Sequence, residues 1–326
     1  MNRFLIAAFS FALGILARAQ QPAAIPQEHT SQPSTAHESD PGLLARLTTP
    51  VTVEFLDGEK SKGTGFFYQI IADSTPGATG PHWVEVKSQY LITNRHVLKP
   101  EKIKSVKTLT FNLRQSVGDG SEWFPITIDQ QELTTRTHLS RDATVDVAAI
   151  DIGDLLHKAL LEQQNKAAIQ PWFAVSAQNL PGASPLSIAS GDDVIVIGYP
   201  NSFVDEHNKL PILKRGLLIT PWGLHFDGKD SFLIDFRGFE GSSGSIVVTK
   251  PTSLIYHDGS LMTSSDPQFL FLGVYSGEPF EPGEIHDTGD QIVQSKIKAD
   301  TGQVWYSYTV EETIHAPSIE DRLKTK

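Results

Sequence analysis

A long succession of short apolar runs, separated by turn residues, constrains the fold of this chain more than any other feature. The runs are rich in Val, Ile, Phe and Tyr, and the gaps between them contain Gly, Pro, Asn and Asp. They include residues 51–55, 90–93, 106–113, 145–152, 194–200, 231–236, 244–249 and 269–275. Short strands joined by tight turns are typical of antiparallel barrels and sandwiches. The pattern therefore predicts an all-β protein rather than alternating strands and helices.

Two local signals refine this prediction. Asp57-Gly58 follows an alternating run and predicts a tight hairpin turn. Residues 154–167 form the one segment with a helical period, because Leu156, Ala159 and Leu160 recur on one face. The chain has 326 residues with 39% apolar content, which is enough to bury the core of one large domain.

The charge and the missing residue types exclude several classes of function. The formal net charge is −11, and an acidic surface argues against nucleic acid and anionic lipid as partners. The chain has no cysteine, so disulfides and thiolate metal sites cannot form. No metal-binding motif, P-loop or dinucleotide glycine pattern is present, so the sequence predicts neither a metal nor a cofactor.

The first 43 residues are predicted to lie outside the folded domain. Arg3 precedes an apolar core at residues 5–16, and Ala17-Arg18-Ala19 forms an A-x-A cleavage signal. Residues 1–19 therefore predict a signal peptide cut between Ala19 and Gln20, with a secreted or periplasmic product that is no longer attached to a membrane. Residues 20–43 are rich in Gln, Pro, Ser and Thr and predict a disordered leader.

A glycine-serine turn at residues 241–245 (GSSGS) is the first candidate for chemistry. It lies between two apolar runs, 232–234 and 246–248. A serine hydroxyl needs a neighbouring base to act as a nucleophile, and backbone N–H donors to stabilise the oxyanion that it creates. Ser243 has a glycine two residues before it, so the N–H groups of Gly241 and Ser243 can converge on one point. Ser242 and Ser245 lack this arrangement.

A histidine and an aspartate stand in contexts that suit such a serine. His96 follows the apolar run 90–93, and Asp146 interrupts the apolar run 145–150. A carboxylate among apolar residues needs a partner, and an imidazole N–H would supply one. Asp142 and Asp151 are the rival carboxylates, but the first belongs to a polar turn and the second to the far end of the run.

Four short motifs resemble those of trypsin-like serine endopeptidases. They are residues 63–67 (GTGFF), 93–97 (TNRHV), 146–148 (DVA) and 241–245 (GSSGS). Their His, Asp, Ser order matches the chymotrypsin-like arrangement. The closest resemblance is to bacterial members without disulfides, such as the HtrA/Deg protease domain. HtrA proteins usually continue into PDZ domains, for which this chain is too short after the serine, and many have Pro or Ala where Ile246 stands.

The resemblance implies a fold and a mechanism. The expected domain spans residues 44–320 and contains two antiparallel six-stranded β-barrels, at about 44–153 and 190–312, with one short helix between them. In the implied mechanism, His96 is the general base, Asp146 orients it and Ser243 is the nucleophile. Gly241 and Ser243 form the oxyanion hole.

The resemblance also implies where a substrate binds. Residues 271–277 resemble the strand beside the primary specificity pocket, so the backbone of Ser276 and Gly277 would pair with an extended peptide. The pocket floor would come from residues 236–239. Arg237 could attract an acidic side chain or point into solvent, and Phe239 could shape an apolar pocket, so the preferred side chain stays open.

Other functions remain compatible with the sequence. A catalytically inactive peptide-binding protein on the same fold is the main alternative to an enzyme that cleaves proteins or peptides, and a serine esterase is a further one. An α/β-hydrolase would need a helix after the serine and the order Ser, Asp, His. Here a β-type run follows Ser243, which disfavours that fold.

Overall fold

The computed structural model describes residues 42–72, 84–163, 169–200, 203–278, 285–287, 292–294 and 300–324. The predicted signal peptide and nearly all of the predicted leader lie outside these ranges. Within them, no helix is both long and apolar enough to cross a membrane.

The first half of the described chain forms a seven-stranded antiparallel sheet in the order β5-β4-β1-β2-β3-β7-β6. Its strands are β1 (Thr48–Phe55), β2 (Lys60–Ile71), β3 (Val86–Thr93), β4 (Val106–Val117), β5 (Gly120–Asp129), β6 (Thr137–Leu139) and β7 (Ala148–Asp151). The predicted turn at Asp57-Gly58 joins β1 to β2, and Gly58 has the positive φ of 87° that such turns favour. One strand more than expected is present because the short β6 pairs with β7.

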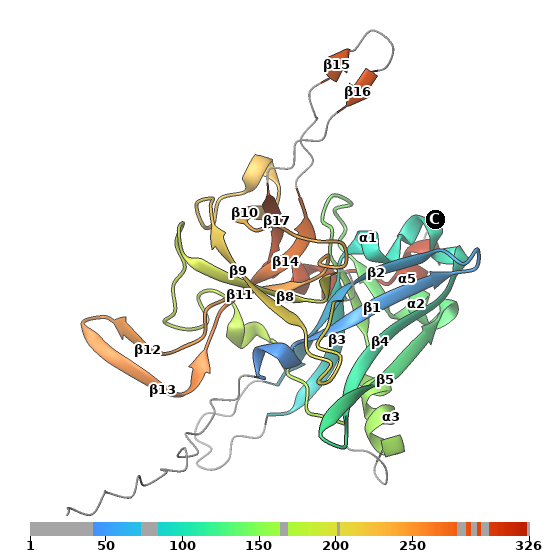
Figure 1. Ribbon diagram of the computed structural model, residues 1–326, viewed down its shortest axis with the longest axis horizontal. Coiled ribbons are helices and arrows are strands. Elements are labelled where there is room, and N and C mark those ends of the chain that lie inside the picture. Colours follow the sequence, from blue (N-terminus) through green and yellow to red (C-terminus); the bar gives the residue numbers. More distant parts are fainter. Residues whose placement is uncertain are drawn as a thin grey trace, which may run out of the picture. The chain divides into compact units, whose positions relative to one another are not determined.

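The second half forms a closed barrel of six strands in the order β10-β17-β14-β11-β8-β9. These strands are β8 (Asp193–Gly198), β9 (Ile212–Leu218), β10 (Ser231–Asp235), β11 (Ile246–Thr249), β14 (Phe271–Gly277) and β17 (Thr301–Tyr306). Figure 1 shows the first sheet, in blue to green, beside this barrel. The predicted all-β architecture in two parts is confirmed.

Alternating side chains along the strands divide the core into three clusters. On β2, Phe67 packs inside the first sheet, whereas Phe66 and Tyr68 face the barrel. On β11, Ile246 and Val248 face the first sheet, whereas Val247 packs inside the barrel. Because strand side chains point alternately to opposite faces, the same strands supply both an inner core and the seam between the two halves.

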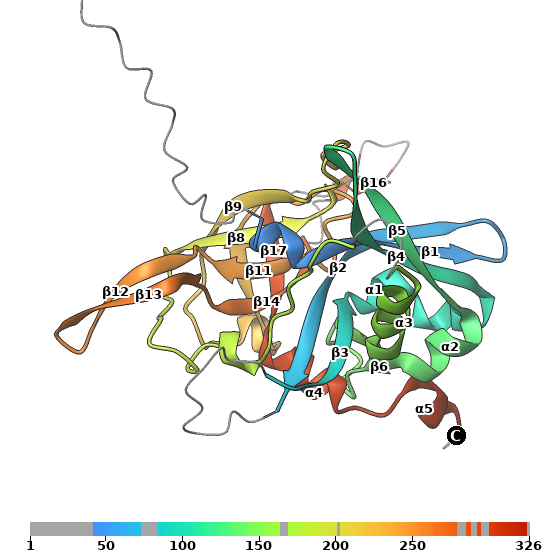
Figure 2. The ribbon, with the colours of Figure 1, turned by 90° about the horizontal axis from the view of Figure 1, so that it is seen from below.

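Two further hairpins lie outside the sheet and the barrel. They consist of β12 (Thr252–His257) with β13 (Ser260–Gln268), and of β15 (Ile285–Asp287) with β16 (Ile292–Gln294). The β12–β13 hairpin therefore accounts for nearly all of residues 251–267, between strands β11 and β14. Figures 1 and 2 both show this hairpin extending away from the barrel strands.

More helices are present than the one predicted. The α-helices are α1 (Arg95–Leu98), α2 (Gln130–Arg136), α3 (Gly153–Gln163), α4 (Tyr308–Ile314) and α5 (Ile319–Lys324). Short 3-10 turns are η1 (Leu44–Arg46), η2 (Pro100–Ser105), η3 (Ala177–Asn179) and η5 (Phe226–Gly228). The predicted helix 154–167 corresponds to α3, and its last residues lie outside the described ranges. Strand β17 ends at Tyr306, and α4 follows it.

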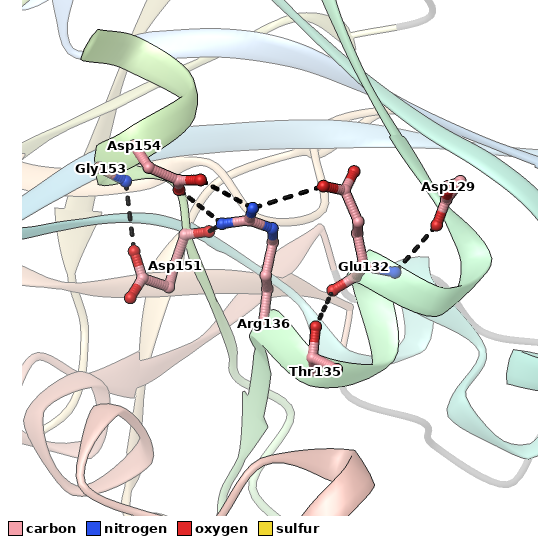
Figure 3. A network of polar contacts seen from close by, with 7 residues as sticks. All are labelled: Asp129, Glu132, Thr135, Arg136, Asp151, Gly153 and Asp154. Carbon is pink, nitrogen blue, oxygen red and sulfur yellow. Dashed lines mark hydrogen bonds and ion pairs between the residues drawn. The ribbon is translucent and has the colours of Figure 1, made fainter. Parts of the chain in front are cut away.

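Arg136, at the end of α2, ties two helices to a strand of the first sheet (Figure 3). Its guanidinium donates to both carboxylate oxygens of Asp154 in α3, at 2.6 and 2.8 Å. It also donates to the carbonyl of Asp151 at the end of β7, at 3.5 Å. Since β7 begins just after Asp146, this fork fixes the far end of the strand that follows a candidate site residue.

Candidate active site

His96 lies in α1, the single helical turn that follows β3. Asn94 precedes this turn in an extended conformation, and its side-chain amide donates to the carbonyl of Asp146 at 2.7 Å. The backbone N–H of His96 donates to Oδ1 of Asp146 at 2.8 Å, and the ring Nδ1 lies 2.6 Å from Oδ2. The structure thus brings these two predicted residues together through both the backbone and the side chain.

A third donor reaches Asp146 from the barrel. Ser276 in β14 donates its hydroxyl to Oδ2 of Asp146 at 2.5 Å. An ionised carboxylate only accepts hydrogen bonds, so the histidine backbone, the histidine ring and the serine all donate to it. With Nδ1 of His96 as a donor, a neutral ring has its other nitrogen, Nε2, left as an acceptor. Sequence reasoning assigned Ser276 a backbone role and missed this side-chain contact.

Ser243 directly follows a tight backbone turn that residues 239–242 form. The N–H of Ser242 donates to the carbonyl of Phe239 at 2.9 Å, and Gly241, the third residue of this turn, has a φ of 87°. A positive φ at that position is the mark of a type II turn, which favours glycine. Within the described ranges, no acceptor is bonded to the N–H of Gly241 or of Ser243, so both remain available to an anion.

Thr64 in β2 links the serine turn to the first sheet. Its hydroxyl donates to the carbonyl of Gly241 at 2.9 Å, and its N–H donates to the carbonyl of Ser243 at 2.8 Å. Its own carbonyl accepts from the hydroxyl of Thr93, three residues before His96, at 2.8 Å. One buried threonine therefore contacts both the strand that leads to the histidine and the turn that carries the serine.

The segments that carry the histidine and the serine both approach Gly63. A Cβ added at Gly63 would lie 2.8 Å from Cγ2 of Val97, next to His96, and 3.0 Å from the carbonyl oxygen of Ser243. Within the described part of the chain, no hydrogen bond joins the Ser243 hydroxyl to the His96 ring. Such bonds are often long without substrate and tighten when it binds.

The segment 236–239, where the sequence placed the pocket floor, is held by a lysine that sequence reasoning missed. Lys214 in β9 donates to the carbonyl of Arg237 at 2.6 Å. Its Nζ lies 4.6 and 4.5 Å from the ring centroids of Phe236 and Phe239. Burial, and then the charge of Arg237, lower the pKa of Lys214. The side chain of Arg237 is 63% exposed, with Nε 3.5 Å from Oδ1 of Asp300.

Tyr275 fills the space behind this segment. A Cβ at Gly238 would lie 1.9 Å from its hydroxyl oxygen, and one at Gly302 would lie 2.6 Å from its ring. Tyr275 is buried, and burial raises the pKa of its hydroxyl. Ser276 and Gly277, the predicted substrate-binding residues, follow it directly at the end of β14, and Gly277 has a φ of 128°. The two packed glycines thus leave room for the tyrosine ring.

The described residues contain no group of three or more His, Asp or Glu side chains arranged to hold a metal ion.

A comparison with known families adds to this geometry. The family described as "Trypsin-like peptidase domain" matches residues 63–255, which is more than half of the chain. The chain belongs to this family. The matched range contains His96, Asp146 and Ser243 and ends before Ser276. No curated protein matches the chain.

Among solved structures, the chain is similar to the active form of the Rv3671c protease from M. tuberculosis. The two are 17% identical with a TM-score of 0.40, over 85% of this chain and 87% of that one. A likeness this remote adds nothing to the family assignment.

Proposed function

We propose that this trypsin-like peptidase is a serine endopeptidase, which hydrolyses peptide bonds inside protein or peptide substrates. The observation that carries the proposal is the position of Asp146. Its carboxylate is held against the ring and the backbone of His96 and against the Ser276 hydroxyl. Thr64 holds the turn of Ser243 beside the strand that leads to the histidine. This is the set of groups that acyl transfer through a serine requires.

Each group then has one role in the proposed reaction. Nε2 of His96 takes the proton from the Ser243 hydroxyl as its oxygen attacks the scissile carbonyl. The N–H groups of Gly241 and Ser243 donate to the oxyanion that forms. His96 passes the proton to the leaving amine, which leaves an acyl-enzyme on Ser243. Water, activated by the same ring, releases the acyl group, while Asp146 holds the ring in one tautomer and stabilises the imidazolium.

The Ser243→Ala variant tests the proposal. It should lose hydrolysis of a casein-type substrate by about 10⁴-fold or more, because no nucleophile remains. It should also lose covalent labelling by a fluorophosphonate probe. Ser260→Ala, at an exposed turn of the β12–β13 hairpin, is the matched control and should keep both properties.

The outcomes separate the alternatives. Full activity in purified Ser243→Ala would refute the assigned nucleophile. A wild-type chain that neither reacts with the probe nor cleaves peptides would support a peptide-binding protein without catalysis. A chain that reacts with the probe and hydrolyses esters, but no peptide, would support an esterase.

The proposal extends to location. Arg3, the apolar run 5–16 and the A-x-A signal support export by a cleaved signal peptide, to the periplasm or the medium. Sequencing the N-terminus of the exported protein should then begin at Gln20, and an intact Met1 would contradict this.

A further inference from the structure

A groove opens beside the exposed side of His96. Its lining comes from α1, the following turn and the loop before β7, and consists of Arg95, His96, Lys99, Pro100, Glu101, Ala143 and Asp146. Two of the three proposed catalytic residues therefore form part of its wall. Because the proposed reaction needs His96 within reach of the scissile bond, a residue that flanks this bond can reach the groove that His96 lines.

Arg95 is the cation of this lining that has no protein partner. Within the described ranges, its guanidinium makes no hydrogen bond and no ion pair, and its Nη1 is buried without a partner. Lys99, in contrast, is paired with Glu59. A buried charge without a partner is costly, so a partner from outside the chain would relieve that cost.

Two other arginines of the first half bind acceptors within the protein. Arg136 makes a two-pronged contact with Asp154. Arg114, which is buried, donates to the carbonyl of Ala45 at 2.8 Å and to Gln170. Arg95 differs from both because it lines a groove and, within the described ranges, its guanidinium has no protein acceptor.

Two more arginines add positive potential behind the groove. Arg322 in α5 donates to the carbonyls of Leu139 and Ser140, in the loop that leads to Ala143. Burial lowers the pKa of Arg322, and the charges of Arg95 and Arg141 lower it further. Their combined field favours an anion in the groove.

Two of the nearby carboxylates, Asp142 and Asp146, already accept hydrogen bonds within the chain. Asp142 accepts from the backbone and hydroxyl of Thr144, both at 2.8 Å, and these bonds lower its pKa more than the charge of Arg95 does. Asp146 accepts from His96 and Ser276. Glu101, which also lines the groove, is exposed and adds a negative charge to its wall.

We propose that this groove is a substrate subsite for an acidic side chain, Asp or Glu, on a residue that flanks the cleaved bond, with Arg95 as the recognising group. The planar guanidinium can bind both oxygens of such a carboxylate. The subsite rests on the proposed peptidase function. It must act against the whole-molecule charge of −11, which repels acidic peptides, so the preference would be a local property of the groove.

Paired peptides test the subsite. Each pair is identical except for Glu against Gln, or Asp against Asn, at one of the positions around a cleaved bond. At one position, the wild type should cleave the acidic peptide with a kcat/KM about 10- to 100-fold higher, which is the range of a charge-assisted hydrogen bond. Arg95→Gln should remove this preference, and Arg95→Lys should keep only part of it because an ammonium lacks the fork.

A matched control removes one positive charge elsewhere. This control is Lys229→Gln. Lys229 is exposed and lies just before β10, whereas the segment that carries Ser243 follows the other end of that strand. It should keep the full preference. The rate of labelling by an uncharged fluorophosphonate, measured in every variant, reports whether the Ser243 machinery is intact. The preference itself is the ratio of kcat/KM for the two peptides of a pair within one variant, so a uniform change in reactivity cancels.

The results distinguish the two proposals. If the wild type cleaves peptides but treats acidic and amide members of every pair alike, the subsite is wrong and the peptidase stands. The same holds if a labelled Arg95→Gln keeps the preference. If the wild type neither reacts with the probe nor cleaves any peptide, both proposals fall. If Arg95→Gln does not fold, the comparison of acidic and amide peptides with the wild type still tests the subsite.

Discussion

Gly244 shows how one residue of the serine turn is fixed by both conformation and packing. Its φ is 86°, a region that L side chains rarely adopt. A Cβ there would lie 2.1 Å from the carbonyl oxygen of Thr64 and 2.6 Å from the hydroxyl of Thr93. These two atoms are hydrogen-bonded to each other in the interior, so neither can withdraw. The position therefore requires glycine for two separate reasons.

A pair of substitutions separates these reasons. Gly259, in the β12–β13 turn, has a φ of 77° but nothing within 4 Å of an added Cβ. Gly259→Ala should therefore lower the free energy of unfolding by about 1–2 kcal/mol, the cost of a left-handed L residue. Gly244→Ala should lower the free energy of unfolding by about 2–3 kcal/mol more than Gly259→Ala does, because the added methyl group overpacks the interior. The fluorophosphonate probe should also label Ser243 slowly in this variant. Urea unfolding measures the stability of both variants. Equal losses of unfolding free energy would show that packing around Gly244 adds nothing to the cost of its positive φ.

Single residues also mark how far the sequence could predict the site. The local sequence around His96 and around Asp146 predicted that their side chains would pair, and the structure contains this pair. His96 follows strand β3, and Asp146 precedes strand β7. The hydroxyl of Ser276 was not predicted to reach Asp146. Strand register, and the packing of the barrel against the first sheet, determine which face of β14 points at the first sheet. A local sequence motif specifies neither of them.

At the scale of elements, the contact between α2 and α3 depends on the charge of Asp154. The hydrogen bonds from Arg136 lower the pKa of Asp154 and raise the pKa of Arg136. A carboxyl group whose pKa is lowered by folding stabilises the protein above its unfolded pKa, near 3.8. That contribution is lost as the pH falls through the lower, folded pKa. Asp154 is 64% exposed, so solvent screens the pair and the effect is modest.

Asp154→Asn tests this linkage. At pH 7 it should lower the free energy of unfolding by about 0.5–1 kcal/mol, since an exposed pair with good geometry has about this value. The difference from wild type should shrink as the pH falls from 3.8 through the lower, folded pKa, because Asp154 becomes protonated first in the unfolded chain and then in the folded one. Glu162→Gln, exposed on the same helix, is the control and should change little. A loss that stays constant with pH would exclude the ion pair as its cause.

Strands were easier to predict than the late helices for a physical reason. Runs such as β1, β4 and β11 alternate or are wholly apolar and are bounded by turn residues, so local pattern and final structure agree. Helix α4 carries Thr309, Val310 and Thr313, and β-branched residues favour strands. All three are buried, so packing in the seam outweighs their local preference and makes this segment helical.

The whole molecule is held together along the seam between the first sheet and the barrel. A single apolar cluster crosses it, with Phe66 from β2, Phe271 from β14 and Val310 from α4 among its members. The rings of Phe66 and Phe271 meet edge to face with centroids 5.3 Å apart. Because the proposed catalytic groups come from both halves, any change that loosens this seam should reduce activity together with stability.

Thr64 tests this coupling because its hydroxyl bonds to the barrel from the first sheet. The hydroxyl donates to the carbonyl of Gly241 and accepts from the N–H of Tyr199, both at 2.9 Å, in the interior. Thr64→Val keeps the shape but leaves both groups unsatisfied, at about 1–3 kcal/mol each.

We therefore expect Thr64→Val to lower the free energy of unfolding by about 2–5 kcal/mol and to slow labelling at Ser243, because the Gly241 peptide loses its anchor. Thr127→Val provides the control, since that hydroxyl bonds to Thr110, and to no other described residue, on an exposed face of the first sheet. It should stay within about 0.5 kcal/mol of wild type and label normally. Urea unfolding and probe kinetics measure the two effects. If Thr64→Val lost stability but labelled at the wild-type rate, the seam would hold the fold without setting the geometry of the serine turn.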